Sequence, residues 1–304
     1  MKPLLMALLV ASIAPLAPLP AQAGAVALSN MNVFALGFQS PPTGLNLQIL
    51  TESRTGTSDA SYNGVAATGV GPGSITDFGP VVVDVGYRCA GACGPSTGAL
   101  YNSTLGGLEN ATNHISTPGQ ANYAIGDMYI SGTALGGAIE GLTRADAVAT
   151  GPTNSGGANS TIKNGGAITG TFTTGSTFVS ALAVGVDLFL QSWIDPLTPV
   201  TETATADAGY GWNMTVSGTG VNLRFAPDDM NLSFFSNNSS NNKFFQNTGF
   251  YYSNLATFTA GETYTFSINQ SANAAVRDVP EPSSLALLGL GLLGLAAARR
   301  KKSL

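Results

Sequence analysis

The chain is poor in the side chains that most often carry out chemistry. Its 304 residues include one histidine, His114, and two cysteines, and only 10% of all residues are charged. A single histidine excludes a metal site built from several imidazoles and leaves little for general acid–base catalysis. We therefore predict that the protein is not an enzyme, and an exported hydrolase is the least favoured alternative.

Basic side chains are scarce outside the two ends of the chain. Five of the 12 Lys and Arg residues are Lys2 and the run from Arg299 to Lys302, whereas all 17 acidic residues lie between Glu52 and Glu281. The part between the two ends thus carries 7 basic and 17 acidic side chains, a net charge of −10. Such a charge repels phosphate backbones. We expect no nucleic-acid partner, while divalent cations and basic partners are tolerated.

The two cysteines, Cys89 and Cys93, lie close together in RCAGACGP. In an oxidising compartment such a pair forms a local disulfide, which stabilises a short loop modestly. Half of a zinc site is the alternative, but zinc takes about four Cys or His ligands and His114 is the only one left. We predict a disulfide and no metal. If the geometry of the ring that the disulfide would close is poor, a reduced pair is the alternative.

Paired carboxylates are also few, and Asp228–Asp229 is the only adjacent acidic pair. Adjacent residues of a strand point to opposite faces, so on a strand they would not cooperate as glycosidase carboxylates do. In a loop, together with Asn and carbonyl oxygens, they are a candidate Ca²⁺ site. A solvated turn after Pro227 is the simpler interpretation, and we predict no cofactor.

Long apolar runs occur only at the two ends, and the first of them reads as a targeting segment. Lys2 precedes an apolar stretch from 4 to 19, which Ala21-Gln22-Ala23 follows as an A-x-A cleavage signal. Pro15 and Pro18 within this stretch, and Pro20 directly after it, argue against a long helix of the folded protein. Residues 1–23 are therefore predicted to be a secretory signal peptide that signal peptidase cleaves after Ala23, with cleavage after Ala25 as the alternative.

Residues 24–278 read as a β-rich body. The chain contains 38 glycines, and Gly, Pro, Asn and Ser separate short alternating apolar runs, a pattern typical of sandwiches and barrels. We predict a mainly β fold, a β-sandwich or a jelly-roll-like body. The polar segment 150–166 is predicted to be a loop. Two architectures are compatible with the pattern: one large sandwich, or two smaller sandwiches with a break at this segment. The predicted strands are 46–51, 80–88, 122–131, 178–193, 210–216, 221–225, 254–259 and 263–269.

The clearest strand is 178–193, FVSALAVGVDLFLQSW. Six of its apolar residues share one parity and Asp187 and Gln191 lie on the other, which is the period of a half-buried strand; the six are Phe178, Leu182, Val184, Val186, Leu188 and Leu190. The last two predicted strands flank the turn 260–262 and are predicted to pair as a hairpin.

Aromatic side chains flank the polar tract SNNSSNNKFFQNTGFYY. On an exposed face such rings stack on sugar rings, whereas at strand spacing they more often belong to a core or to cross-strand pairs. Both interpretations are open, and the candidate glycan-facing residues are Phe244, Phe245, Tyr251 and Tyr252.

The C-terminal apolar run has the features of a marginal membrane anchor. Residues 283–298 carry no charge, and as a helix they would span about 24 Å, less than the hydrocarbon core of about 30 Å. Positive residues stay in the cytoplasm, so the cluster of Arg299, Arg300, Lys301 and Lys302 places the C-terminus inside and the body outside. The N-terminal signal requires the same orientation. Pro280 and Pro282 break any preceding helix and expose Glu281.

This order of a Val-Pro-Glu-Pro motif, an apolar helix and a basic cluster over residues 279–304 resembles the PEP-CTERM protein-sorting domain of Gram-negative bacteria. The resemblance implies that Pro280, Glu281 and Pro282 are recognised by an exosortase, an integral-membrane cysteine transpeptidase-like enzyme, and that the catalytic cysteine belongs to that partner. It also implies a link to exopolysaccharide, biofilm or floc matrix. The body is not covered by the resemblance.

Together these features predict an exported protein whose tail is a transient helix in the inner membrane before processing. Its predicted destination is the cell surface, outer envelope or extracellular matrix, where a structural or adhesive role in an exopolysaccharide or biofilm context is expected. A carbohydrate-binding module on the cell surface is the alternative.

Overall fold

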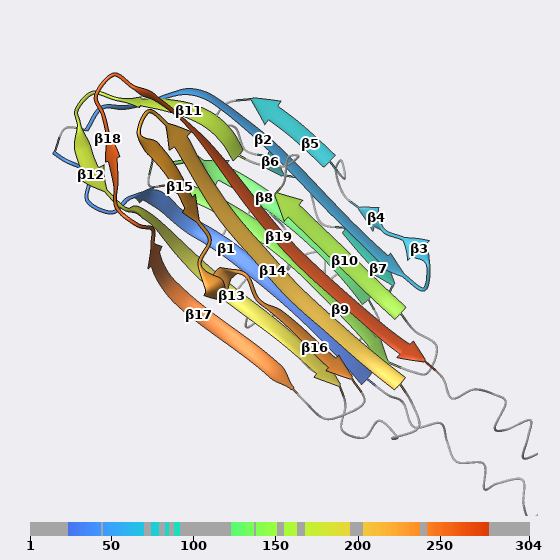
Figure 1. Ribbon diagram of the computed structural model, residues 1–304. Helices are drawn as coiled ribbons and strands as arrows, with labels where there is room; N and C mark the ends of the chain where they lie inside the picture. Colours follow the sequence, from blue (N-terminus) through green and yellow to red (C-terminus); the bar gives the residue numbers. More distant parts are fainter. Residues whose placement is uncertain are drawn as a thin grey trace, which may run out of the picture.

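The computed structural model describes residues 24–43, 45–69, 74–78, 83–84, 88–91, 123–136, 138–150, 155–162, 168–194, 203–237 and 242–279. These residues form strands almost throughout, arranged in two antiparallel sheets that face each other as a β-sandwich (Figure 1). The prediction of a mainly β body is confirmed.

The first sheet has eight strands in the order β17-β13-β1-β9-β8-β7-β4, and β6 pairs with β8. Its central strand β1 begins at Gly24, directly after the predicted signal peptide. The strands are β1 (Gly24–Phe38), β4 (Thr68–Gly69), β6 (Val83–Asp84), β7 (Arg88–Gly91), β8 (Tyr123–Gly132), β9 (Ile139–Thr150), β13 (Leu182–Ile194) and β17 (Lys243–Tyr252).

The second sheet has nine strands. Its main order is β10-β2-β11-β19-β14-β15, with β3 and β5 on β2, β16 on β14, and a further pairing of β10 with β19. The strands are β2 (Leu47–Tyr62), β3 (Val65–Ala66), β5 (Ser74–Phe78), β10 (Ser155–Ile162), β11 (Ile168–Thr174), β14 (Thr203–Gly218), β15 (Val221–Phe225), β16 (Ser233–Asn237) and β19 (Thr263–Val279). A separate pair consists of β12 (Phe178–Ser180) and β18 (Ala256–Phe258), and η4 (Asp228–Met230) is a short 3₁₀ helix.

Alternation of side chains explains which face of each strand is buried. In β19 every second residue from Tyr264 to Val276 is buried, and the residues between them are polar or small and more exposed. In 178–193 the predicted apolar parity is buried too, but Phe189 and Gln191 of the other parity are also buried, and Ala181 divides the segment into β12 and β13. The buried faces of both sheets contribute to one contiguous apolar cluster, as expected for two packed layers.

The segment 150–166, predicted to be a loop, contains strand β10. Its Gly, Asn and Ser residues have low strand propensity, but β10 pairs with β2 on one side and β19 on the other. Backbone hydrogen bonds to strands on both sides stabilise β10 despite its low strand propensity. A prediction from local propensity does not anticipate such long-range pairing.

The predicted hairpin between 254–259 and 263–269 is wrong. The turn is present, since Glu262 N donates to Thr259 O over 3.3 Å, but β18 then pairs with β12 rather than with β19. Strand β19 instead pairs with β14 over its whole length, from Thr203↔Val279 to Gly218↔Tyr264. The aromatic pair formed by Phe178 and Phe258 accompanies the β12–β18 pairing, with ring centroids 5.3 Å apart.

The two ends of the sandwich differ in their chain connections. β1 begins and β19 ends at one end, which we call the terminal end, whereas β12 and β18 lie at the opposite, distal end (Figure 1). Since the described chain leaves β19 at Val279, the motif that starts at Pro280 follows the terminal end directly. Among the described residues no helix is long and apolar enough to cross a membrane; the signal peptide and the tail helix predicted for 283–298 lie outside them.

Candidate functional site

The aromatic segment predicted as a glycan surface forms β17, the edge strand of the eight-stranded sheet. Alternation sorts its side chains between two faces. Phe245 and Tyr251 point toward the sandwich interior, where they pack on the core. Phe244, Phe250 and Tyr252 point outward, and each keeps more than half of its side-chain surface exposed, between 52% and 54%.

The inward side of β17 is anchored. The Tyr251 hydroxyl donates to Asp229 Oδ2 over 3.0 Å and accepts from Asn247 Nδ2 over 2.7 Å. Burial, and next the hydrogen bond to Asp229, raise the pKa of Tyr251. Lys243 Nζ donates to Phe235 O of β16 over 2.7 Å. These contacts hold the strand in place, so the outward rings stand on a fixed base.

Each end of the outward strip rests on a ring from a neighbouring strand. Phe244 packs edge-on against Phe189 of β13, with centroids 5.4 Å apart. Phe250 packs at 90° against Phe34 of β1, with centroids 5.7 Å apart. The second pair meets over Gly185 of β13, where a Cβ atom would lie 2.6 Å from the Phe34 ring and 2.8 Å from the Phe250 ring. The glycine therefore provides the space in which the two rings meet.

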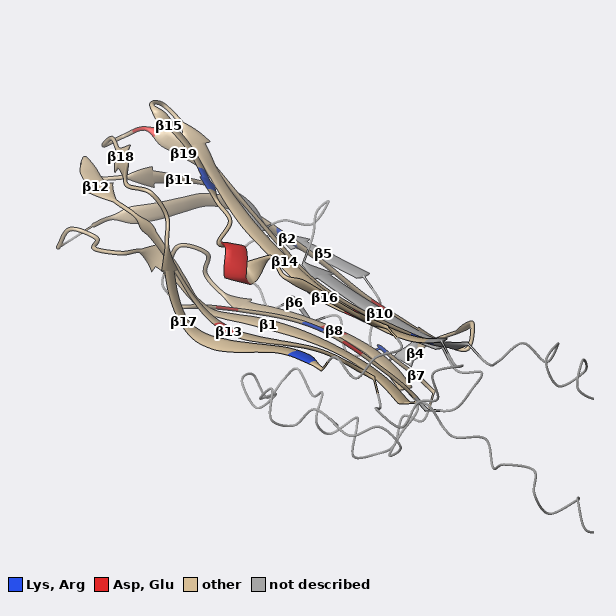
Figure 2. Ribbon diagram, turned by 60° about the horizontal axis from the view of Figure 1, so that its bottom comes forward, with Lys and Arg blue, Asp and Glu red and all other residues tan. Residues whose placement is uncertain are grey.

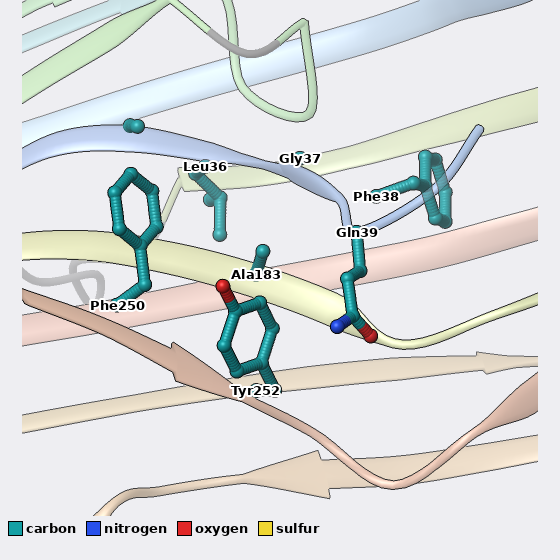
Figure 3. A pocket seen from close by; sticks show the side chains of 8 residues that line it. Leu36, Gly37, Phe38, Gln39, Ala183, Phe250 and Tyr252 are labelled. Atoms are coloured by element: carbon teal, nitrogen blue, oxygen red, sulfur yellow. The ribbon is translucent and has the colours of Figure 1, made fainter.

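A shallow hollow of about 260 Å³ lies beside the strip, on the outer face near the distal end. Small residues form its floor, because Ala35, Gly37 and Ala183 leave the sheet surface low there. Phe250 and Tyr252 line it from β17, and Gln39 brings an amide (Figure 3). No residue that lines it is charged at neutral pH, so the hollow suits a neutral ligand with an apolar face and hydroxyl groups.

One carboxylate lies at the middle of the strip, where Thr248 Oγ1 donates to Asp187 Oδ1 of β13 over 2.8 Å. Charged residues are sparse over both sheets, and the acidic turn at η4 is the largest acidic feature in view (Figure 2). Exposed aromatic rings over small residues, with an amide at one side, match the apolar face and hydroxyl rim of a sugar ring. Among the described residues that line the hollow, none is a carboxylate, a histidine or a basic side chain.

The acidic pair Asp228–Asp229 lies in η4 rather than on a strand. Asp229 receives the Tyr251 hydroxyl, whereas Asp228 lines a polar hollow with Asn213, Arg224 and Asn231. Within the described ranges no three His, Cys, Asp or Glu side chains gather as metal ligands.

Two buried ion pairs lie away from the surface. Arg54 Nε donates to Glu52 Oε1 over 2.8 Å, and Arg144 Nη2 lies 2.6 Å from Asp146 Oδ2, all with side chains no more than 1% exposed. Burial raises the pKa of Glu52, and the Arg54 guanidinium opposes that effect. Without solvent access these groups do not form a ligand site.

Several predicted site residues lie outside the described residues. They are Ala21, Ala23, Cys93, His114, Pro280, Glu281, Pro282, Arg299, Arg300, Lys301 and Lys302. Cys89 is buried on β7 and takes part in a disulfide bond.

Sequence reasoning missed the neighbours that complete the strip. Phe34 comes from β1, Gln39 directly follows β1, and Gly185 comes from β13, all far from β17 in sequence. A usable signal was present in β13, where Gly185 interrupts an otherwise large-residue strand; glycine inside a strand often marks a close approach of another group.

Comparison with known proteins gives one match. No curated protein and no solved structure is detectably similar to the chain. Residues 278–301 match the family model of the PEP-CTERM protein-sorting motif. PEP-CTERM proteins are exported and sorted to the cell surface, and the motif implies processing by an exosortase. The chain is therefore a carrier of the PEP-CTERM sorting motif, joined to a β-sandwich body.

Proposed function

We propose that the body is a non-catalytic, adhesive component of the cell surface or of its exopolysaccharide or biofilm matrix. Its binding surface is the outward aromatic strip of β17, formed by Phe244, Phe250 and Tyr252 together with the adjoining hollow. The exposure of these three rings on an anchored edge strand is the observation that carries the proposal. Sugar-ring stacking needs flat, accessible rings on a fixed support.

The position of the strip in the fold supports this role. The sorting motif follows the terminal end, while the hollow lies near the distal end, beside the last residues of β1 and Gln39. β19 alone has 17 residues, and at about 3.3 Å per residue it spans most of the distance between the two ends. A body held at its terminal end thus presents the hollow away from the attachment point.

Charge also favours a neutral polysaccharide. The body carries an excess of acidic groups, but none of the residues that line the hollow is charged. We therefore expect binding that depends weakly on salt, because screening affects charged contacts most.

A polysaccharide pull-down tests the proposal. The full-length protein, produced in an exporting host, is mixed with matrix polysaccharide, and the bound fraction is measured against Phe250→Ala and Tyr252→Ala. Loss of one stacking ring typically costs at least about 1.4 kcal/mol, or tenfold in affinity. The matched control is Phe235→Ala, an exposed phenylalanine on β16 of the other sheet. Equal loss in all three variants, or in none, contradicts the proposal.

A separate experiment tests sorting. Replacing Glu281 with Ala should leave the precursor membrane-bound and unprocessed in a host with an exosortase, since the Pro-Glu-Pro motif is then incomplete. Immunoblotting of membrane and surface fractions measures the outcome, and normal processing would refute recognition of Glu281. Glu262→Ala, in the β18–β19 turn, is the matched control.

A further inference from the structure

Strand β17 has an unpaired edge. It hydrogen-bonds to β13 on one side, and no strand in the described part of the chain pairs with its other side. Its ten residues make it the longest of the described strands at a sheet edge; β15 and β16, at the edge of the second sheet, have five residues each. An open edge of this length is a template for pairing with a further strand.

The backbone groups that face the free edge can be identified. Ser253 N donates to Leu182 O over 2.9 Å, directly after the end of β17. In an antiparallel ladder such bonds recur at every second residue, and the β13–β17 register is unbroken from Ala183↔Tyr252 to Ser192↔Lys243. The N–H and C=O groups that point away from β13 therefore belong to Phe244, Gln246, Thr248, Phe250 and Tyr252.

The edge lacks the features by which proteins usually block such pairing. Proline, inward charges and bulges are typical protective devices. β17 has no proline, and its ladder with β13 has no bulge. Its one charge is Lys243 at the first position, whose Nζ is bound to Phe235 O.

We propose that the free edge of β17 pairs antiparallel with β17 of a second copy of this chain, about a two-fold axis at Thr248. The sequence FFQNTGFYY, from Phe244 to Tyr252, is self-complementary about this residue. Phe244 lies opposite Tyr252 of the partner subunit, and Phe245 lies opposite Tyr251 of the partner subunit. Every free N–H and C=O on the edge then has a partner.

Physical chemistry favours this occupant over a segment of unrelated sequence. A two-fold interface uses one patch twice and must be complementary to itself, and aromatic cross-strand pairs stabilise a sheet. Lys243 meets the uncharged Ser253 of the partner subunit, so no like charges face each other. The pairing closes at two copies, because each chain offers this edge once.

Pairing leaves the outward rings on the outer face and joins two strips into one continuous aromatic surface. The dimer stands without the glycan proposal, since it is measured in the absence of polysaccharide. A dimer that fails to bind polysaccharide would reject only the proposed function, and a monomer that binds would reject only the pairing.

Cysteine cross-linking of the full chain in an exporting host tests the axis. Thr248→Cys places two thiols opposite each other across the two-fold axis. The two residues form a hydrogen-bonded pair, in which the Cα atoms are about 5.5 Å apart, within the range of a disulfide. We expect a disulfide-linked dimer on a non-reducing gel. Thr215→Cys, exposed on the outer face of β14, is the control and should remain monomeric. A dimer fraction no higher than that of the control overturns the proposal.

Light scattering of the purified, processed protein tests the edge itself. We expect a dimer for the wild type and a monomer for Gln246→Pro, which removes a free N–H without breaking the β13 ladder. Asn247→Pro is the contrasting variant, since its N–H faces β13 and its loss should lower the melting temperature. A monomeric wild type, an assembly larger than two, or a dimeric Gln246→Pro protein contradicts pairing through this edge.

Discussion

At the distal end of the sandwich the two sheets are separated by aromatic rings, whereas toward the terminal end they meet through alanines. Phe172 lies in the distal cluster, within 5.3 to 6.2 Å, centroid to centroid, of Phe38, Phe258, Tyr264 and Phe266. Toward the terminal end the buried residues that face the other sheet are largely Ala25, Ala27, Ala147, Ala149, Ala206, Ala208 and Ala274.

The small side chains let polar groups of one sheet reach the backbone of the other. Ser29 Oγ donates to Gly209 O over 2.7 Å, and Ser192 Oγ donates to Ala206 O over 2.8 Å. A serine side chain is short, so these bonds require closely approaching sheets. The distal end thus relies on the burial of large apolar surface, and the terminal end on close approach and cross-sheet hydrogen bonds.

The largest expected effect comes from emptying the aromatic end. Phe172→Ala removes a fully buried ring and should lower the free energy of unfolding by about 3–5 kcal/mol. Chemical denaturation measures it. The control is Phe250→Ala, which removes the same side chain from the exposed strip and should change stability by less than about 0.5 kcal/mol. Similar losses in both variants would show that the distal cluster is not a packed core.

Overfilling the alanine end should have the next largest effect. Ala147 lies in a row of buried alanines across β8, β9 and β1, opposite Ala124 and Ala27. Ala147→Leu forces the close sheets apart and should cost about 1–3 kcal/mol, measured in the same denaturation experiment. Ala275→Leu, exposed on the outer face of β19, is the control. An unchanged Ala147→Leu protein would mean that the sheets are not close there.

A smaller loss is expected where the two packing modes meet. Gln270 Nε2 donates to Met31 O and Gly141 O of the opposite sheet, both over 2.9 Å. Gln270→Met keeps the side-chain length but removes the donor, which should cost about 1 kcal/mol. Asn269→Ala, on the outer face of β19, controls for loss of an amide, and thermal unfolding compares them. If Gln270→Met unfolds at the same temperature as the wild type, the hydrogen bonds of Gln270 make no net contribution to stability.

The smallest stability effect is expected at Gly185. The atoms that a Cβ would meet are the outer ends of the Phe34 and Phe250 rings, which can turn aside, so Gly185→Ala should change stability by less than about 0.5 kcal/mol. Polysaccharide binding should nevertheless weaken, because the ring pair is displaced. Gly249→Ala, where a Cβ meets nothing, is the control. If both variants bind polysaccharide equally well, the Phe34–Phe250 ring pair does not contribute to ligand recognition.

Much of the strand content was predictable, because alternation is written locally. The predicted strands at 46–51, 122–131, 210–216 and 221–225 lie within or largely overlap β2, β8, β14 and β15. Their pairing was not predictable in the same way. The turn at 260–262 predicted a hairpin, yet a non-local aromatic contact between Phe178 and Phe258 accompanies the pairing of β18 with β12.

The candidate site divides along the same line. The aromatic content of β17 was evident from the sequence, and four residues were predicted to face glycan. Alternation placed Phe244 and Tyr252 outward and Phe245 and Tyr251 against the core, but the parity could not be assigned without the interior as a reference. The hollow needed small residues from β1 and β13, which lie at least 60 residues before β17 in the sequence.

The sequence by itself determined the export route, because a signal peptide and a sorting motif are recognised as short linear segments, and it determined a β-rich body, because alternation is local. Only the tertiary structure decided which strands pair, which ring faces solvent and which edge stays open. Those properties depend on contacts between residues distant in the chain, and the free energy of such contacts is not encoded in any one segment.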